Sequence, residues 1–188
     1  MVISRRLDSK QLSEVINARY TYLMNQSTHT LAEKLGNALH QQGAKVTAAE
    51  SCTGGGVAHA ITAVAGSSSW FEYGFVTYAN TAKHKLLGVS NELLISEGAV
   101  SEAVVRQMVE GAARVGNADY AVAISGIAGP GGGTDEKPVG TVWFAWYSPN
   151  GVKAKKYLLS GDRAAVREQA IKISLQELLH QVTGCNTV

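Results

Sequence analysis

The chain has 188 residues, 45% of them hydrophobic, and a formal net charge of +2. This composition predicts a folded domain with a real core and excludes a disordered chain. The small positive charge gives no support to nucleic-acid binding, and no apolar stretch approaches the ~20 residues that a membrane-spanning helix needs. With two cysteines and five widely spaced histidines, the sequence predicts neither a disulfide framework nor a metal site. The charged N-terminus argues against a signal peptide, so we expect a cytoplasmic protein.

The first 26 residues differ from the rest of the chain. They are polar and contain neither glycine nor proline, and we expect a peripheral extension at 1–26 followed by one domain at 27–188. Thr30-Leu31-Ala32-Glu33 has the pattern of a capping box at the start of a helix, and Gly43 fits the end of that helix.

Apolar periodicity and turn residues predict that strands and helices alternate from there on. Tyr120-Ala121-Val122-Ala123-Ile124 is an unbroken apolar run, typical of a strand buried on both faces. The order predicts an α/β fold with three layers (α/β/α), a mostly parallel central sheet and an antiparallel C-terminal hairpin. The expected elements are a strand at 44–49, a helix at 53–65, a strand at 75–78 that could begin near Trp70, helices at 80–87, 91–96 and 101–115, a strand at 120–124, a hairpin of 139–147 and 152–159, and a helix at 162–182.

The turn after the first strand carries three candidate nucleophiles. Ser51, Cys52 and Thr53 precede glycines that allow a backbone to approach a ligand closely. A helix begins there, and its free N–H groups suit an anion. Ser51 or Thr53 could instead cap the helix, and Cys52 could be a small core residue. Cys52 also competes with Ser51 as nucleophile, because a helix start lowers the pKa of a thiol.

A serine nucleophile needs a base, and no histidine lies in the nearby loops. Lys83 can act as the base if burial lowers its pKa, and Tyr78 could relay a proton or orient Ser51. Taken alone, Tyr78 also fits a core position and Lys83 a solvated one.

A second loop, at 125–134, contains five glycines and a proline. Its N–H groups could form a nest for a phosphate, or it could be a plain surface loop. It lacks the Gly-Lys-Ser/Thr ending of a P-loop, and neither glycine-rich loop has the dinucleotide fingerprint. Arg163 at a helix start opposes the helix dipole, which suggests that it meets an anion, whereas Asp162 fits an N-cap.

Together these segments resemble the CinA C-terminal domain family, and among its members the stand-alone nicotinamide-nucleotide amidases. The resemblance covers about residues 30–180. It departs at Gly56, where many relatives carry a bulkier residue, and at Tyr73, where a charged residue is common. The stretches that carry it are 47–55, 66–71, 74–80 with Lys83, 98–101, 125–130, 137–142 and 161–163.

The resemblance implies hydrolysis of nicotinamide mononucleotide to nicotinate mononucleotide and ammonia, in pyridine nucleotide recycling, without cofactor or metal. It implies that Ser51 is the nucleophile, that Tyr78 and Lys83 activate it, and that Arg163 is a functional residue of the catalytic site, which we expect to bind the phosphate or to steady the site. We expect backbone N–H groups near Cys52–Gly55 to hold the oxyanion. Further substrate contacts are expected from Cys52, Thr53, Gly54, Gly55, Asn80, Gly126, Gly129, Gly131, Gly132 and Thr134.

The resemblance also implies a homo-oligomer, a dimer or a higher assembly, with no nucleic-acid or membrane partner. Two alternatives stay open. One is a catalytically idle nucleotide-binding or regulatory paralogue with the same fold, and the other is an interaction module linked to competence or DNA damage. The combined presence of Ser51, Tyr78, Lys83 and Arg163 favours the enzyme.

Overall fold

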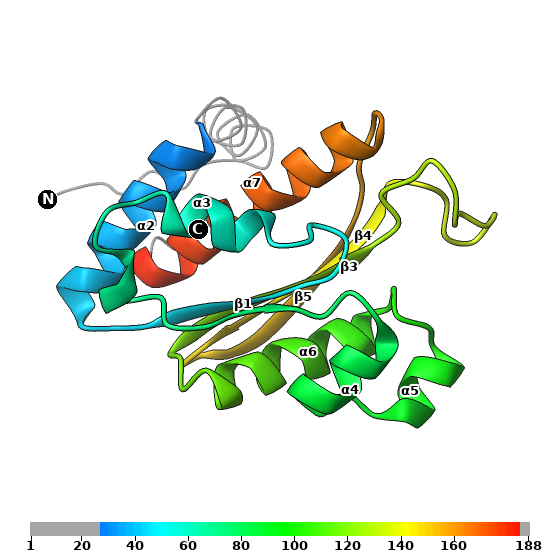
Figure 1. Ribbon diagram of the computed structural model, residues 1–188, viewed down its shortest axis with the longest axis horizontal. Helices are drawn as coiled ribbons and strands as arrows, with labels where there is room; N and C mark the ends of the chain where they lie inside the picture. The colour runs from blue at the N-terminus through cyan, green and yellow to red at the C-terminus, as the bar shows by residue number, and fades with distance from the viewer. Residues whose placement is uncertain (1–26, 185–188) are drawn as a thin grey trace, which may run out of the picture.

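The computed structural model describes residues 27–184. The predicted peripheral extension at 1–26 lies outside them. Within the described chain, a single five-stranded sheet has the strand order β2-β1-β3-β4-β5 (Figure 1). Strand β1 pairs in parallel with both β2 and β3, whereas β4 runs antiparallel to β3 and to β5. The strands are β1 (Val46–Glu50), β2 (Gly74–Val76), β3 (Tyr120–Gly126), β4 (Thr141–Ser148) and β5 (Gly151–Leu158).

Helices cover both faces of the sheet, which confirms the predicted three-layer α/β fold (Figure 1). One face carries α2 (Thr28–Gln42), α3 (Gly56–Thr62) and α7 (Arg163–Thr183). The other carries α4 (Asn80–Leu87), α5 (Asn91–Ser96) and α6 (Glu102–Val115). A short 3₁₀ helix at Ser67–Ser69 connects α3 to β2. None of the helices in the described residues is long and apolar enough to span a bilayer.

Strand β3 contributes to both cores. Val122 and Ile124 belong to the cluster that contains α2 and α7, while Ala121 and Ala123 belong to the cluster built on α6. Successive side chains of a strand point to opposite faces, so an apolar run without alternation is required where both faces are covered. The prediction of a fully buried strand is therefore confirmed.

The element boundaries follow local capping chemistry. The Ser27 hydroxyl accepts the N–H of Thr30, so α2 begins earlier than the predicted capping box at Thr30. Gly43 ends α2 in the left-handed conformation, with φ of 62°, as predicted. Ser101 and Asp162 cap α6 and α7, also as predicted.

Two predicted elements are shorter than expected. Helix α3 spans seven residues, because residues 51–55 form a turn that leads into it. Strand β2 spans three residues, and Trp70 ends the 3₁₀ helix instead of starting that strand. Trp70 lies beside the start of β1, whereas the late start of α3 and the early end of β2 enlarge the irregular region at the opposite edge of the sheet.

That edge is where the parallel strands β1, β2 and β3 have their carboxyl ends. The Ser51 N–H donates to the Ile124 carbonyl at 2.9 Å, and the Thr77 N–H donates to the Glu50 carbonyl at 2.8 Å. These bonds join the three chain segments just as they leave the sheet. In open α/β sheets this edge is the usual place for a ligand.

Candidate active site

A serine and a lysine meet at the carboxyl end of β1. The Lys83 Nζ donates to the Ser51 Oγ at 3.1 Å and to the Thr77 carbonyl at 2.8 Å. The Lys83 side chain is only 1% exposed. Among the described residues, no carboxylate forms an ion pair with it. The structure therefore brings the predicted nucleophile and the predicted base into direct contact.

Burial decides the protonation behaviour of Lys83. Loss of solvent around the ammonium lowers the pKa of Lys83 below its ordinary value of 10.5, and only nearby Cys52 acts in the opposite direction. Helix α4 causes this burial, because Lys83 and Leu87 are four residues apart and share its inner face. A buried amine with a lowered pKa beside a hydroxyl is suited to general base catalysis.

The neighbouring thiol has the opposite character. Cys52 is buried, and desolvation is the main reason that its pKa rises to about 11. A hydrogen bond with its own backbone is the strongest effect that lowers the pKa, the charge of Glu50 raises it further, and Arg167 and Lys83 have smaller lowering effects. A thiol in this state stays protonated near neutral pH and is a poor nucleophile. The geometry thus favours Ser51 over Cys52.

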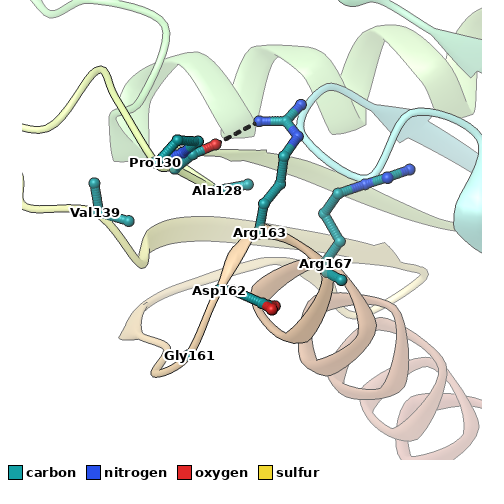
Figure 2. Close-up of a pocket in the computed structure, with 9 residues that line it drawn as sticks. Ala128, Pro130, Val139, Gly161, Asp162, Arg163 and Arg167 are labelled. Atoms are coloured by element: carbon teal, nitrogen blue, oxygen red, sulfur yellow. Dashed lines mark hydrogen bonds between the residues drawn. The ribbon is translucent and has the colours of Figure 1, made fainter.

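Tyr78 makes its hydrogen bond with Arg163. The Arg163 Nη2 donates to the Tyr78 hydroxyl at 2.8 Å. Its Nη1 donates to the Gly129 carbonyl at 2.8 Å, the bond dashed in Figure 2. In the described part of the chain, Tyr78 has no hydrogen bond to Ser51 or to Lys83. The contact between Ser51 and Lys83 is direct, while Tyr78 and Arg163 link the segment after β2, the loop after β3 and the start of α7.

A cavity of about 520 Å³ opens beside this link (Figure 2). Arg163 and Arg167 extend from α7 on the same side, one helical turn apart. The only carboxylate in the lining is that of Asp162, which accepts the Ala165 N–H as the cap of α7. The positive charge of the two arginines therefore suits an anion. The lining residues are Ala128, Gly129, Pro130, Val139, Gly161, Asp162, Arg163, Ala164 and Arg167.

Arg167 is a residue that the sequence analysis missed. Its Nη2 donates to the Thr53 carbonyl at 2.8 Å, and its buried Nε has no hydrogen-bond partner. Arg167 thus connects the cavity to the turn that carries Ser51. The spacing of four residues from Arg163 was the available signal, because it places both side chains on one face of a helix.

Glu50 is the second missed residue. Its carboxylate, 1% exposed, accepts the N–H groups of Gly55 and Val57 at 3.0 Å and of Ala58 at 2.8 Å. This corrects the expected oxyanion site, since the Gly55 N–H and the start of α3 are occupied by Glu50. A glutamate at a strand end, five residues before a glycine at a helix start, was the signal in the sequence.

The other predicted substrate-binding residues lie in varied settings. The Gly54 N–H donates to the Ser51 carbonyl, and Asn80 is exposed at the start of α4. Gly126 ends β3, where a Cβ would come within 3.0 Å of β4. Of the glycine-rich loop, Gly129 lines the cavity. Gly131, Gly132 and Thr134 are exposed and lie outside that lining, and Thr134 accepts the Lys137 N–H within the loop.

The two departures from the family pattern lie away from the cavity. Gly56 packs against α7, where a Cβ would come within 2.4 Å of the Ile171 side chain. Tyr73 is half exposed and stacks on Phe75. No group of side chains able to hold a metal ion is found among the described residues.

Comparison with known proteins places this arrangement in a family. The model of the CinA C-terminal domain matches residues 28–182. The chain belongs to the CinA C-terminal domain family. Within it, the nicotinamide-nucleotide amidohydrolase PncC of Escherichia coli strain K12 is 57% identical over 152 residues, which are 80% of this chain and 92% of that protein. PncC of Pseudomonas putida is 53% identical over 150 residues, or 80% and 94%.

Solved structures of the family share the fold. The competence damage-inducible protein A of Klebsiella pneumoniae MGH 78578 superposes with a TM-score of 0.82 at 38% identity, over 86% of this chain and all of that one. A CinA superfamily protein from Escherichia coli gives a TM-score of 0.79 at 38% identity, over 81% and 89%.

Proposed function

We propose that the chain is an amidohydrolase that converts nicotinamide mononucleotide into nicotinate mononucleotide and ammonia, in the recycling of pyridine nucleotides. The observation that carries the proposal is the contact at 3.1 Å between the buried Lys83 amine and the Ser51 hydroxyl. A cavity of about 520 Å³ is lined by Arg163 and Arg167 but not by Ser51 or Lys83; Arg167 links it to the turn that carries Ser51 by donating to the Thr53 carbonyl. The identity above one half to proteins named nicotinamide-nucleotide amidohydrolase gives the substrate.

The first half of the reaction forms an acyl-enzyme. Neutral Lys83 takes the proton of Ser51 as the Oγ attacks the carboxamide carbon, and the electron pair of the carbonyl bond moves to its oxygen. The Lys83 ammonium then gives the proton to the amide nitrogen. The carbon–nitrogen bond breaks, ammonia leaves, and the nicotinoyl group stays on Ser51 as an ester.

The second half repeats the sequence with water. Lys83 takes a proton from water as the water oxygen attacks the ester carbon, and the proton returns to the Ser51 oxygen as that bond breaks. The second proton of the water stays on the carboxylic acid, which releases it to solvent near neutral pH and leaves as the carboxylate. The expected role of Tyr78 in activating Ser51 is retained as an indirect one, since its hydroxyl is bound by Arg163.

Arg163 and Arg167 are proposed to hold the phosphate of the nucleotide. Guanidinium groups bind phosphate through two parallel hydrogen bonds, and two of them at the end of one helix give a strong, directed anion site. The backbone of Gly129 forms part of the wall of the same cavity. Gly129 and Arg163 thus remain substrate-binding residues, and Arg167 joins them.

The assembly and the cellular location are further parts of the proposal. Exposed apolar side chains at and beside the short edge strand β2, Tyr73 and Val76, support self-association into a homo-oligomer. A free, buried cysteine and a nucleotide substrate support a cytoplasmic enzyme. Nucleic acid and membranes are not proposed as partners.

A direct assay tests the proposed activity. Purified protein should release ammonia from nicotinamide mononucleotide, with equal rates in the presence and absence of EDTA. Circular dichroism should show that the sample is folded. Folded protein that releases no ammonia above the blank would reject the amidase and favour the idle nucleotide-binding paralogue. Calorimetry would then detect the binding of nicotinamide mononucleotide directly.

A further inference from the structure

Glu50 places a carboxylate beneath the turn that carries Ser51. Its two oxygens bind three N–H groups, those of Gly55, Val57 and Ala58. Gly55 is the N-cap residue of α3 and has no side chain to cap the helix. Glu50 therefore caps the helix from the far side of the turn, and the intervening residues form a closed ring.

The same ring is tied to the rest of the site by other bonds. The Ser51 N–H donates to the Ile124 carbonyl at 2.9 Å, and Arg167 donates to the Thr53 carbonyl at 2.8 Å. With Glu50 at one side and these two bonds at the other, the backbone of the turn is held from β3, α3 and α7. This fixes the direction in which the Ser51 side chain leaves the backbone, toward Lys83.

Capping by Glu50 also decides which N–H groups remain for a substrate. The Gly54 N–H is taken by the Ser51 carbonyl. In the described residues, no oxygen accepts the N–H of Cys52 or of Thr53. Thr53 is fully buried, whereas Cys52 keeps 7% of its surface exposed. Cys52 directly follows the nucleophile and is the less buried of the two, so its N–H is the better placed donor for an oxyanion.

We propose that Glu50 is a positioning residue for the reaction at Ser51. Its carboxylate binds the N–H groups of α3 and so holds the turn in the form in which Ser51 meets Lys83 and the Cys52 N–H faces the developing oxyanion. Glu50 contacts neither the substrate nor the reacting atoms. The inference rests on the proposed amide hydrolysis and adds a residue to it.

Glu50→Gln is the main test. The amide keeps the size of the side chain but replaces one acceptor oxygen by an NH₂ group that faces a backbone N–H. Loosening of the turn should lower kcat about 10²-fold, which is the effect expected when a reacting group such as the Ser51 Oγ is misplaced by about 1 Å. KM for nicotinamide mononucleotide should stay unchanged, because Arg163 and Arg167 are untouched.

Ser101→Ala is the matched control. Ser101 caps α6 through the Val104 N–H at 3.4 Å, on the opposite face of the sheet. Its loss should lower the thermal stability and leave kcat unchanged. A Glu50→Gln variant that behaves like this control, with a lower Tm and an unchanged kcat, would show a plain helix cap and overturn the proposal. A raised KM with unchanged kcat would overturn it as well.

A second pair of variants covers the case in which Glu50→Gln does not fold. Gly55 and Gly66 are both N-cap glycines, with φ of 95° and 79°. A Cβ meets only an ordinary contact at Gly55 and open space at Gly66, so alanine strains the backbone equally at both. Only the Gly55 N–H is bound by Glu50. Gly55→Ala should lower kcat, and Gly66→Ala should not. Equal kcat values would contradict the proposal.

Labelling of Ser51 separates this inference from the proposed substrate. A fluorophosphonate places its phosphoryl oxygen where the oxyanion would lie, so the labelling rate reports on the turn without nicotinamide mononucleotide. Glu50→Gln should be labelled measurably more slowly than the wild type. Equal rates would reject the role of Glu50. Wild-type protein that is labelled but releases no ammonia from the nucleotide would reject the proposed substrate alone.

Discussion

The two glycine-rich loops follow neighbouring strands of one sheet, but they are built in opposite ways. The backbone of the turn after β1 is held by hydrogen bonds to the Glu50 carboxylate, the Ile124 carbonyl and the Arg167 guanidinium. The loop after β3 is largely exposed from Pro130 to Glu136, and the Thr134 hydroxyl is used within the loop. Glycine content alone does not separate them; the partners of their polar groups do.

The two loops differ in how precisely their groups must be placed. Bond making at Ser51 requires a fixed nucleophile, base and oxyanion donor, so the turn after β1 leaves few polar groups free. Binding of a phosphate requires charge more than exact placement, and arginines on the first turns of α7 supply it. The loop after β3 contributes where Gly129 meets Arg163.

The largest effect is expected at Ser51. Ser51→Ala removes the attacking oxygen, and kcat should fall roughly 10⁶-fold, the order of loss when a serine hydrolase loses its nucleophile. Ammonia release under saturating substrate gives the value. Substrate binding, measured by calorimetry, should stay close to that of the wild type. Substantial remaining turnover would mean that the fixed turn carries another nucleophile.

Lys83→Met should lower kcat about 10²- to 10⁴-fold, because the general base is lost while an unbranched side chain of similar length remains.

The wild-type pH profile gives a second readout. Burial lowers the pKa of Lys83, and only the neutral amine accepts a proton. Activity should therefore rise with pH through a midpoint below 10.5 and then level off.

Lys83→Met should lose the rise of activity with pH. The lowered pKa of Lys83 also makes the stability of the wild-type protein depend on pH. The unfolded chain keeps its proton up to a higher pH than the folded one, so the free energy of unfolding should increase with pH between the two pKa values of Lys83. An activity profile that is identical in Lys83→Met and wild type would exclude Lys83 as the base.

Arg163→Met tests the other region. Loss of one charged hydrogen bond, about 2 kcal/mol, should raise KM for nicotinamide mononucleotide roughly 30-fold. Nicotinamide riboside, which lacks the phosphate, should show the same KM with variant and wild type. An equal loss of kcat on both substrates would instead assign Arg163 to the orientation of Tyr78.

The smallest effect is expected at Cys52. Cys52→Ala removes a protonated, buried thiol, so kcat should be unchanged and the protein should lose about 1 kcal/mol of stability from the small cavity. The wild-type thiol should also resist alkylation at neutral pH, because its pKa is raised to about 11. Loss of turnover in the folded variant would transfer the nucleophile from Ser51 to Cys52.

Local patterns were enough to predict most of the fold and part of the site. Ser101 was correctly predicted as the cap of α6, and the apolar run at 120–124 located the central strand. The predicted cap of α4, Asn80 or Thr81, was wrong, because Ala79 is its N-cap and makes no side-chain bond. The residues alone left the pairing of Ser51 with Lys83 as one of several alternatives, and the family resemblance selected it. Spacing along the chain does not show that two residues more than thirty positions apart come into contact.

Glu50 and Arg167 were missed for a different reason. Each acts through bonds that join elements distant in sequence: Arg167 of α7 reaches the Thr53 carbonyl, and Glu50 of β1 reaches the start of α3. A sequence pattern shows the residue type, but not which backbone groups stay unpaired until a distant side chain arrives. The helix start at Gly55 therefore looked free for an anion, although Glu50 occupies it.

The attachment site of the acyl group tests the central claim most directly. A reaction with nicotinamide mononucleotide, quenched by acid before steady state, can be digested and sequenced by mass spectrometry. We expect a nicotinoyl-nucleotide ester on Ser51, absent from Ser51→Ala and present in Cys52→Ala. A thioester on Cys52, or ammonia release without any adduct on the 51–53 turn, would contradict it.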